Sequence, residues 1–288
     1  LRLMEPQDLE EEVLAENPGE DSVFVGISEK GKRVHIKQSF RRMHTQVIGT
    51  TNAGKTESVI LPWAIDDIKK GRGLLIVDGK SDRSLLDKLY AYAKRYRRED
   101  DVRILSLCEP SMSHTFNPLS GGSALEVTER IFKAYSFESE YYKSLQYEAM
   151  LQLLLLFEKV GLRPTPIRIV EALQSPVLVK DLAANVTDEA TARWVQAFTS
   201  LTKEEREQRT SGLVAQLQAF AVGETASVFN ADISDIDLAH ALDQGLIIYC
   251  QLPVLKIPTL GKATGKLILQ CLQSAVASVQ AAVPITAG

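Results

Sequence analysis

Residues 49–56 have the pattern Gly-x-x-x-x-Gly-Lys-Thr, directly after the apolar stretch "HTQVI" and directly before a run with helical spacing. Glycines at both ends let a backbone bend tightly, so that its N–H groups can point inward at the positive end of the following helix. Lys55 would add a mobile charge for terminal phosphates, and the Thr56 hydroxyl would bind a metal ion. The pattern therefore predicts a short strand, a phosphate-binding loop and a helix, in this order.

The ligand predicted for this loop is ATP with Mg²⁺. Lys55 is the predicted catalytic residue because its charge would lie against the β and γ phosphates. The predicted nucleotide-binding residues are Gly49, Thr50, Thr51, Asn52, Ala53, Gly54, Lys55, Thr56 and Glu57.

Asp78 ends the apolar run "GLLIVD" at 73–78, which is typical of a strand buried on both faces. Open α/β sheets bind ligands at the carboxyl edge, so Asp78 is a candidate to hold Mg²⁺ through water, together with Thr56. The alternative is a structural pair with Lys80. No apolar run in the sequence ends in Asp-Glu, the pair that polarises the attacking water in ATPases of this kind. Either that strand lies outside these residues or hydrolysis is impaired.

Strand and helix patterns alternate around the loop. Residues 22–40 predict a β-hairpin with its turn at Gly31, and the helix after the loop should kink or restart near Pro62 and stop at Gly71. A second helix is expected over 81–99 with Ser81 as its N-cap, followed by a buried strand at 102–107. This order predicts right-handed crossovers and an α/β fold with a mostly parallel sheet.

The pattern changes at about residue 121, where a run of helices with little strand character begins and continues to about 222. It opens with a capping box formed by Ser123 and Glu126. A strand at 246–253 and a long final helix then return to the α/β pattern. We expect an acidic linker at 1–21, a discontinuous nucleotide-binding domain formed by 22–120 and 231–288, and an inserted all-α domain at 121–230.

Composition suits a globular protein, since 45% of the 288 residues are hydrophobic and 24% are charged. The densest apolar stretch, "MLQLLLLF" at 150–157, is far shorter than the ~20 residues that cross a bilayer. The chain starts at Leu1 rather than Met, so we expect it to begin inside a longer protein. The net charge is −4, but residues 1–21 carry −7, so the remainder carries +3 and a nucleic-acid partner is not excluded.

Cysteines and basic clusters give weaker indications. Cys108, Cys250 and Cys271 show no paired spacing, and we expect buried free thiols in a reducing compartment. Two groups of basic residues are either solvated surface or contacts with a neighbouring subunit's nucleotide or a nucleic-acid backbone. The first group is Lys30, Lys32, Arg33, Lys37, Arg41 and Arg42, and the second is Lys94, Arg95, Arg97 and Arg98.

Five segments occur in an order that is hard to obtain by accident. They are "RRMHTQVIGTTNAGKT" at 41–56, "GLLIVDGKSD" at 73–82, "SHTFNPLSGG" at 113–122, "RTSGLVAQLQAF" at 209–220 and "DIDLAHALDQGLIIYCQLP" at 235–253. Together they resemble the type IV secretion coupling proteins of the TraG/TraD family, motor ATPases related to the FtsK and HerA DNA translocases. The resemblance covers roughly residues 22–280. Asn52-Ala53 departs from the Gly-Ser or Arg-Ser that is frequent in the family, and neither an Asp-Glu strand nor an arginine finger is present.

The resemblance implies a RecA-like P-loop NTPase that assembles as a homo-hexamer. It also implies membrane helices before Leu1 and a location on the cytoplasmic face of the bacterial inner membrane. Its partners would be the components of a type IV secretion channel, and its cargo would be relaxase-bound DNA or effector and adaptor proteins recognised by the helical domain.

Two other functions remain open from the sequence. A soluble FtsK/HerA-like DNA translocase would need no membrane anchor, and a nucleotide-gated adaptor without hydrolysis would need no Asp-Glu strand. Small-molecule kinases share the phosphate loop, but the long helical region and the "FNPL" segment argue against them.

Overall fold

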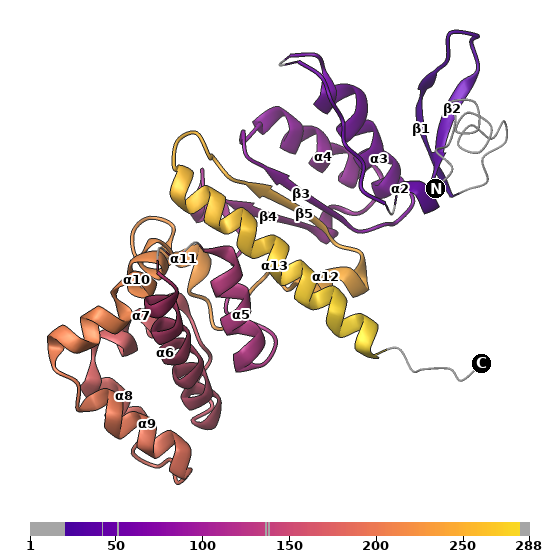
Figure 1. Cartoon of the computed structure of the whole chain (residues 1–288). Coiled ribbons are helices and arrows are strands. Elements are labelled where there is room, and N and C mark those ends of the chain that lie inside the picture. The colour runs from indigo at the N-terminus through magenta and orange to yellow at the C-terminus, as the bar shows by residue number, and fades with distance from the viewer. Residues whose placement is uncertain (1–20, 42, 51, 136, 138, 283–288) are drawn as a thin grey trace, which may run out of the picture. The chain divides into compact units, whose positions relative to one another are not determined.

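The computed structural model describes residues 21–41, 43–50, 52–135, 137 and 139–282, and all structural statements concern these residues. The chain divides into two compact units. Figure 1 colours the whole chain by residue number, so that the segments of each unit can be found from their numbers. The first unit contains the described residues up to Leu74 together with Arg83–Asp101. The second contains Leu75–Asp82 and the described residues from Val102 onward.

The first unit opens with the predicted hairpin. Strands β1 (Ser22–Ile27) and β2 (Arg33–Lys37) pair antiparallel, with a bulge between Phe24 and Gly26. Gly31 has a φ of +74°, which a glycine adopts without strain in the tight turn between them. The short helix α2 (Gln38–Arg41) follows directly. The prediction of a hairpin with its turn at Gly31 is therefore confirmed.

The helix after the phosphate loop changes type at Pro62, as predicted. A π-helical turn, η1 (Thr56–Ile60), runs into helix α3 (Leu61–Lys69), and Pro62 lies at the start of α3. Proline has no N–H to donate to the preceding turn, so an α-helical bond cannot continue through it. Helix α3 packs against helix α4 (Arg83–Arg95), and a short 3₁₀ turn, η2 (Glu99–Asp101), ends the unit.

Two local expectations in this part of the chain are wrong. The segment "HTQVI" at 44–48 forms no strand in the described structure, and Ile48 is 85% exposed. A strand exists only where its backbone groups pair with a neighbour, and apolar character alone does not provide that pairing. Ser81 is also not in an N-cap conformation, because its φ is +61° and α4 begins two residues later, at Arg83.

The second unit contains the sheet. Strands β3 (Leu74–Asp78), β4 (Val102–Ser106) and β5 (Ile247–Gln251) lie in the order β3-β5-β4, and only Leu74 belongs to the first unit. Strands β4 and β5 run parallel, from Val102 opposite Ile247 to Ser106 opposite Gln251. The last of the described strands, β5, therefore occupies the central position, and all five of its residues are buried. The prediction of an α/β fold with a parallel sheet is therefore confirmed.

The chain between β4 and β5 is helical. After the 3₁₀ turn η3 (Pro110–Met112), the elements are α5 (Ala124–Ala134), α6 (Glu140–Lys159), α7 (Pro166–Gln174), α8 (Pro176–Leu182), α9 (Glu189–Thr199), α10 (Lys203–Ala221), α11 (Ala226–Phe229) and α12 (Leu238–Gln244). The capping box of Ser123 and Glu126 is present at the start of α5, as predicted. None of the described helices is both long enough and apolar enough to cross a membrane.

The core of the second unit joins these helices to the sheet. Buried side chains of α5, α6, α7 and α10 belong to one hydrophobic cluster with β4, β5 and helix α13 (Pro258–Ala282). Helix α13 approaches the sheet closely at Gly265, where an added Cβ would lie 3.4 Å from the Leu252 side chain and 3.7 Å from that of Val77. A separate all-α domain at 121–230 and the other domain boundaries stay predictions.

Candidate functional site

The backbone of the loop at 49–56 has the conformation that a phosphate cradle needs. Asn52 and Gly54 have φ angles of +64° and +75°, and Lys55 then adopts right-handed helical angles. Successive residues of opposite hand turn their N–H groups toward one concave side, which makes an anion-binding nest. Asparagine and glycine are the residue types that enter the left-handed region at low cost. Asn52-Ala53 is therefore compatible with the cradle despite its departure from the family pattern.

Gly49 leaves room for the lysine of the motif. A Cβ added at Gly49 would lie 3.3 Å from both Cγ and Cδ of Lys55 and 3.4 Å from the Ala53 side chain. A larger residue at position 49 would therefore push the Lys55 stem out of its place. The two ends of the motif are linked by this packing.

Lys55 folds back over the start of the loop. Its ammonium group donates hydrogen bonds to the carbonyl oxygens of Gly49 and Thr50, the latter at 2.8 Å. An ammonium has three donors, so one remains for another partner. The Lys55 charge is thereby held against the start of the loop, and within the part of the chain that the structure describes no carboxylate pairs with it.

The remaining loop residues lie around this lysine. Thr56 is the first residue of the π-helical turn, and Glu57 accepts a hydrogen bond from Lys88 at 2.6 Å. Asn52 and Ala53 are exposed. Thr51, predicted as a nucleotide-binding residue, lies outside the described residues. Among the described residues no group of three or more His, Cys, Asp or Glu could hold a metal ion, so an ion at Thr56 would take further oxygen ligands from phosphates and water.

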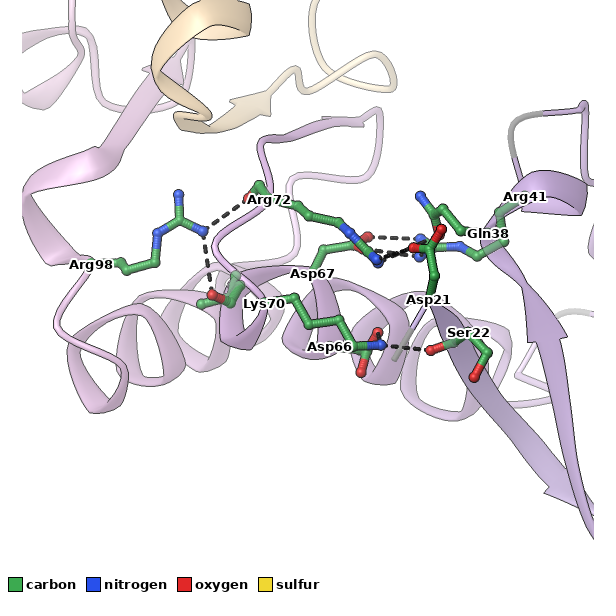
Figure 2. A network of polar contacts seen from close by, with 10 residues as sticks. Asp21, Ser22, Gln38, Arg41, Asp66, Asp67, Lys70, Arg72 and Arg98 are labelled. Carbon is green, nitrogen blue, oxygen red and sulfur yellow. Dashed lines mark hydrogen bonds and ion pairs between the residues drawn. The ribbon is translucent and has the colours of Figure 1, made fainter. Parts of the chain in front are cut away.

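A network of ion pairs ties helix α3 to the hairpin within the first unit (Figure 2). Both guanidinium NH₂ groups of Arg41 bind the Asp67 carboxylate, at 2.9 and 2.7 Å, and the guanidinium lies 5.2 Å from the centre of the Trp63 ring. Arg72 binds the same carboxylate at 3.3 Å and reaches Asp21 at 2.6 Å. Asp67 is buried, so its charge depends on these two partners.

Two of the cations predicted as candidate nucleic-acid or neighbour contacts serve this internal network instead. Arg41 binds Asp67, which raises the pKa of the arginine. Arg98 binds Asp101 at 2.7 Å and the carbonyl oxygens of Ile68 and Arg72, as Figure 2 shows for the two carbonyls. Sequence clustering could not separate these paired cations from exposed ones, because their partners lie up to 30 positions away. Arg42 lies outside the described residues.

Asp78 lies at the carboxyl end of β3 with three hydrogen bonds inside the second unit. Its Oδ1 accepts from the Lys80 N–H at 2.8 Å, and its Oδ2 accepts from the Asp82 N–H at 2.6 Å and from the Tyr249 hydroxyl at 2.7 Å. A carboxylate can accept about four hydrogen bonds, so Oδ1 keeps one open position. The Lys80 contact is made by its backbone and not by its ammonium group.

Tyr249 is a site residue that sequence reasoning missed. It lies on β5 with 1% of its surface exposed, and burial together with the bond to Asp78 raises the pKa of its hydroxyl. A buried tyrosine hydroxyl almost always has a hydrogen-bond partner, so "LIIYCQLP" did indicate that one must exist. The next residue on the same face of β5, Gln251, accepts from the Ser106 hydroxyl at 2.8 Å and donates to the Ser81 carbonyl at 3.4 Å. Polar contacts therefore link all three strands at their carboxyl ends.

The "FNPL" segment is held by Asn117, whose surface is 1% exposed. Its Nδ2 donates to the carbonyls of Pro164 and Ala231, at 2.8 and 3.2 Å, and its Oδ1 accepts from the Leu119 N–H at 2.9 Å. The Asn117 N–H donates to the Ser234 hydroxyl at 2.7 Å. One side chain thus joins three loops of the second unit, which explains the residue type at this position without any ligand.

The cysteines differ from the expectation in one case. Cys250 and Cys271 are buried free thiols as predicted, and burial raises their pKa values to about 12 and about 11. Cys108 is exposed, which contradicts the prediction of a buried thiol. It lies two residues after β4 ends, so the chain has already left the sheet at that point.

The fold and the loop together are compatible with the P-loop class of proteins. The sequence model of the family described as "Type IV secretory system Conjugative DNA transfer" matches residues 4–277. The chain is also 27% identical over 141 residues to "Type 4 coupling protein DotL" of Legionella pneumophila subsp. pneumophila (strain Philadelphia 1). That match covers 45% of this chain and 18% of DotL.

Because the family match spans nearly the whole chain, this protein belongs to the coupling-protein family of type IV secretion. The family predicted from the order of the five segments is therefore confirmed.

Proposed function

We propose that this chain is the ATP-driven motor part of a coupling protein, with ATP and Mg²⁺ bound at the loop 49–56. The observation that carries the proposal is the loop itself, in which Gly54 with positive φ leads into Lys55 and Thr56 at the start of a helix. This arrangement places backbone N–H groups and a lysine charge on one concave side, which suits a polyphosphate. Membership of the coupling-protein family supports the same reading.

Each residue then has a defined role. Lys55 exchanges its bonds to the Gly49 and Thr50 carbonyls for bonds to phosphate oxygens, which compensate the lysine charge more fully than carbonyl dipoles. The N–H groups of residues 52–56 orient the phosphates. The Thr56 hydroxyl would hold the metal ion, and Asp78 would contribute through a water molecule. Mg²⁺, when bound, supplies positive charge against the phosphate oxygens.

The proposal extends to the fold and the assembly. The α/β sheet would be of the RecA-like type, with the helices of 121–230 as an inserted cargo-recognition domain. The chain would form a homo-hexamer on the cytoplasmic face of the inner membrane, anchored by segments outside these residues. It would pass relaxase-bound DNA, or effector and adaptor proteins, to the secretion channel. The description of the family, conjugative DNA transfer, supports DNA as one cargo.

The substitution Lys55→Ala tests the proposal. Loss of the ammonium should weaken binding of a fluorescent ATP analogue about a hundredfold, because each charge-assisted bond to phosphate contributes more than a neutral one. The same change in the full-length protein should abolish ATP hydrolysis and transfer. Lys143→Ala, on the exposed side of α6, removes a lysine far from the loop in sequence and should leave binding unchanged. Wild-type nucleotide affinity in Lys55→Ala would refute the proposal.

A second candidate function is a nucleotide-gated adaptor that does not hydrolyse ATP. The observation that favours it is the carboxyl edge of the described sheet, where β3, β4 and β5 end in Asp78, Ser106 and Gln251 and none is followed by glutamate. Phosphate release by the full-length protein distinguishes the two functions. ATP binding without release would select the adaptor.

A further inference from the structure

The outer face of the β1–β2 hairpin combines exposed cations with an exposed aromatic ring. Side chains alternate along a strand, so Arg33, His35 and Lys37 share one face of β2. The register places Phe24 opposite His35 and, beyond the bulge, Ile27 opposite Arg33. The Arg33 guanidinium lies 5.6 Å from the centre of the Phe24 ring, and the His35 ring lies 5.5 Å from it, which confirms that these side chains share a face.

The opposite face of the hairpin is already occupied. Val23, which pairs with Ile36, is 1% exposed, and β1 contacts α3. Lys70, directly after α3, donates to the Ser22 carbonyl, and the ion pairs of Figure 2 tie both ends of the hairpin to the region of α3. The hairpin is therefore anchored through its inner face. On the outer face, Phe24 is 43% exposed and Ile27 is 69% exposed.

The charge of the hairpin is opposite to that of the chain as a whole. Residues 22–37 contain four cations, Lys30, Lys32, Arg33 and Lys37, against the single acid Glu29, so their net charge is +3. The whole chain carries −4. A local cationic surface on an acidic protein favours a polyanionic partner at that surface alone.

We propose that the outer face of the hairpin binds single-stranded nucleic acid, with Arg33 and Lys37 on phosphates and Phe24 stacked on a base. Charge complementarity selects a polyanion, and the exposed ring selects unpaired bases, because a duplex hides the faces of its bases. The choice of cargo rests on the proposed function, in which the protein moves DNA.

Fluorescence anisotropy of a labelled oligothymidylate of about 20 nucleotides, longer than one binding site, measures this interaction with the chain free of nucleotide. Binding should weaken as salt rises. The double variant Arg33→Glu/Lys37→Glu should bind at least tenfold more weakly and lower the slope of log K against log salt by about 1.4, or about 0.7 per lost phosphate contact.

A matched control separates local charge from net charge. Lys262→Glu/Lys266→Glu makes the same change in net charge on α13, where both lysines are exposed and lie outside the proposed cargo-recognition region. This control should keep both the affinity and the salt slope of the wild type. An equal loss in the control and the hairpin variant would overturn the proposal, because the effect would then be one of overall charge.

The aromatic contact has its own signature. Phe24→Leu keeps an apolar side chain but removes the stacking surface, so affinity should fall about tenfold while the salt slope stays unchanged. Phe24→Trp should restore or exceed wild-type affinity, which a merely structural role would not predict. Thermal unfolding of both variants shows whether the hairpin remains folded. Wild-type affinity in Phe24→Leu would overturn the stacking contact.

Two further measurements complete the test. Vesicles that contain phosphatidylglycerol present the alternative polyanion, and if they bind the hairpin while the oligonucleotide does not, the proposal is overturned in favour of a membrane surface. Lys55→Ala should bind the oligonucleotide like the wild type. The failure of the hairpin proposal and the failure of the proposed ATP site are therefore distinguishable.

Discussion

The loop at 49–56 and the segment at 113–122 are both recognisable from sequence, but they differ in what surrounds their residues. Asn52 and Ala53 of the loop are exposed, and Lys55 is held by two carbonyls of the loop itself. Asn117 of the segment is 1% exposed and bonds to two other loops, one at Pro164 and one at Ala231 and Ser234. Residue types in the segment are explained by the chain's own bonding. The loop instead leaves Asn52 and Ala53 exposed and one ammonium donor of Lys55 open, which is compatible with the nucleotide site proposed above.

Thiol reactivity offers the largest expected contrast between the two regions. Cys271 packs against the segment, with its thiol 3.8 Å from the Pro118 carbonyl oxygen, and burial raises its pKa to about 11. A raised thiol pKa favours the neutral, unreactive form throughout the ordinary pH range. In a Cys108→Ser background, a cysteine introduced by Ala53→Cys should react with a thiol reagent at pH 8 about a thousandfold faster than Cys250 and Cys271.

The raised pKa of Cys271 also predicts that the folded protein loses stability at high pH. Because the folded pKa of Cys271 lies above its unfolded value of 9.0, its contribution to stability is complete below pH 9 and is lost as pH rises toward 11.

Rapid labelling of Cys271 at pH 8 in the folded protein would contradict the predicted difference in thiol reactivity between the two regions, because the segment would then open as readily as the loop.

Asn117→Ala should have the next largest effect, and it acts on stability. The change leaves the carbonyls of Pro164 and Ala231 without their donor and costs about 3 kcal/mol or more. Thermal unfolding should show a fall in Tm of about 10 °C. Asn185→Ala makes the same deletion at an exposed position and should leave Tm unchanged. An Asn117→Ala protein with the Tm of the wild type would contradict the view that the segment serves stability while the loop does not.

Gly49→Ala should have the opposite effect, because it should weaken nucleotide binding and leave stability nearly unchanged. The added methyl group meets the flexible stem of Lys55 at 3.3 Å, which can move aside, so stability should change by less than about 0.5 kcal/mol. The displaced ammonium should weaken nucleotide binding about tenfold, since small misplacements of a charged group reduce its interaction with a ligand. Isothermal titration with ATP measures the affinity. A large fall in Tm with unchanged affinity for ATP would show that Gly49 serves stability and not nucleotide binding.

Tyr249→Phe should have the smallest effect. It tests whether Asp78 bonds only to groups of the chain, as Asn117 does, or also takes part in binding the ligand proposed for the loop. Loss of the 2.7 Å hydrogen bond should cost about 1 kcal/mol, or about 2–4 °C in Tm. If Asp78 also holds the metal ion, nucleotide affinity should fall a few fold with Mg²⁺ present and stay constant without it. Equal affinity under both conditions would make Asp78 a purely structural residue.

Local signals in the sequence predicted local structure well. Ser123 and Glu126 cap α5 from three residues apart, Gly31 closes the hairpin, and Pro62 marks the change in helix type. Each of these depends on neighbours within one or two turns of chain. The positions of the sheet strands were also predictable from continuous apolar runs, and β5 is fully buried as such runs suggest. The expectation that β3 is buried on both faces is wrong, because none of its residues is buried and Val77 is 39% exposed.

Contacts between distant residues were not predictable in the same way. Tyr249 binds Asp78 across 171 positions, and Arg41 binds Asp67 across 26. A single sequence states that a buried hydroxyl needs a partner but does not state which one. The missing strand at 44–48 has the same cause, since strand formation requires a partner that local apolar character does not identify.

The π-helical turn at Thr56–Ile60 has a mechanical consequence. A π-turn holds one residue more than an α-turn, so it is a movable defect that can migrate along a helix when the chain is pulled or pushed. Pro62 blocks this migration, because it cannot donate the N–H that a shifted turn would require. A rearrangement of the loop would therefore be absorbed upstream of Pro62. The part of α3 that carries Asp67, and with it the base of the hairpin, would keep its register if the loop changed shape.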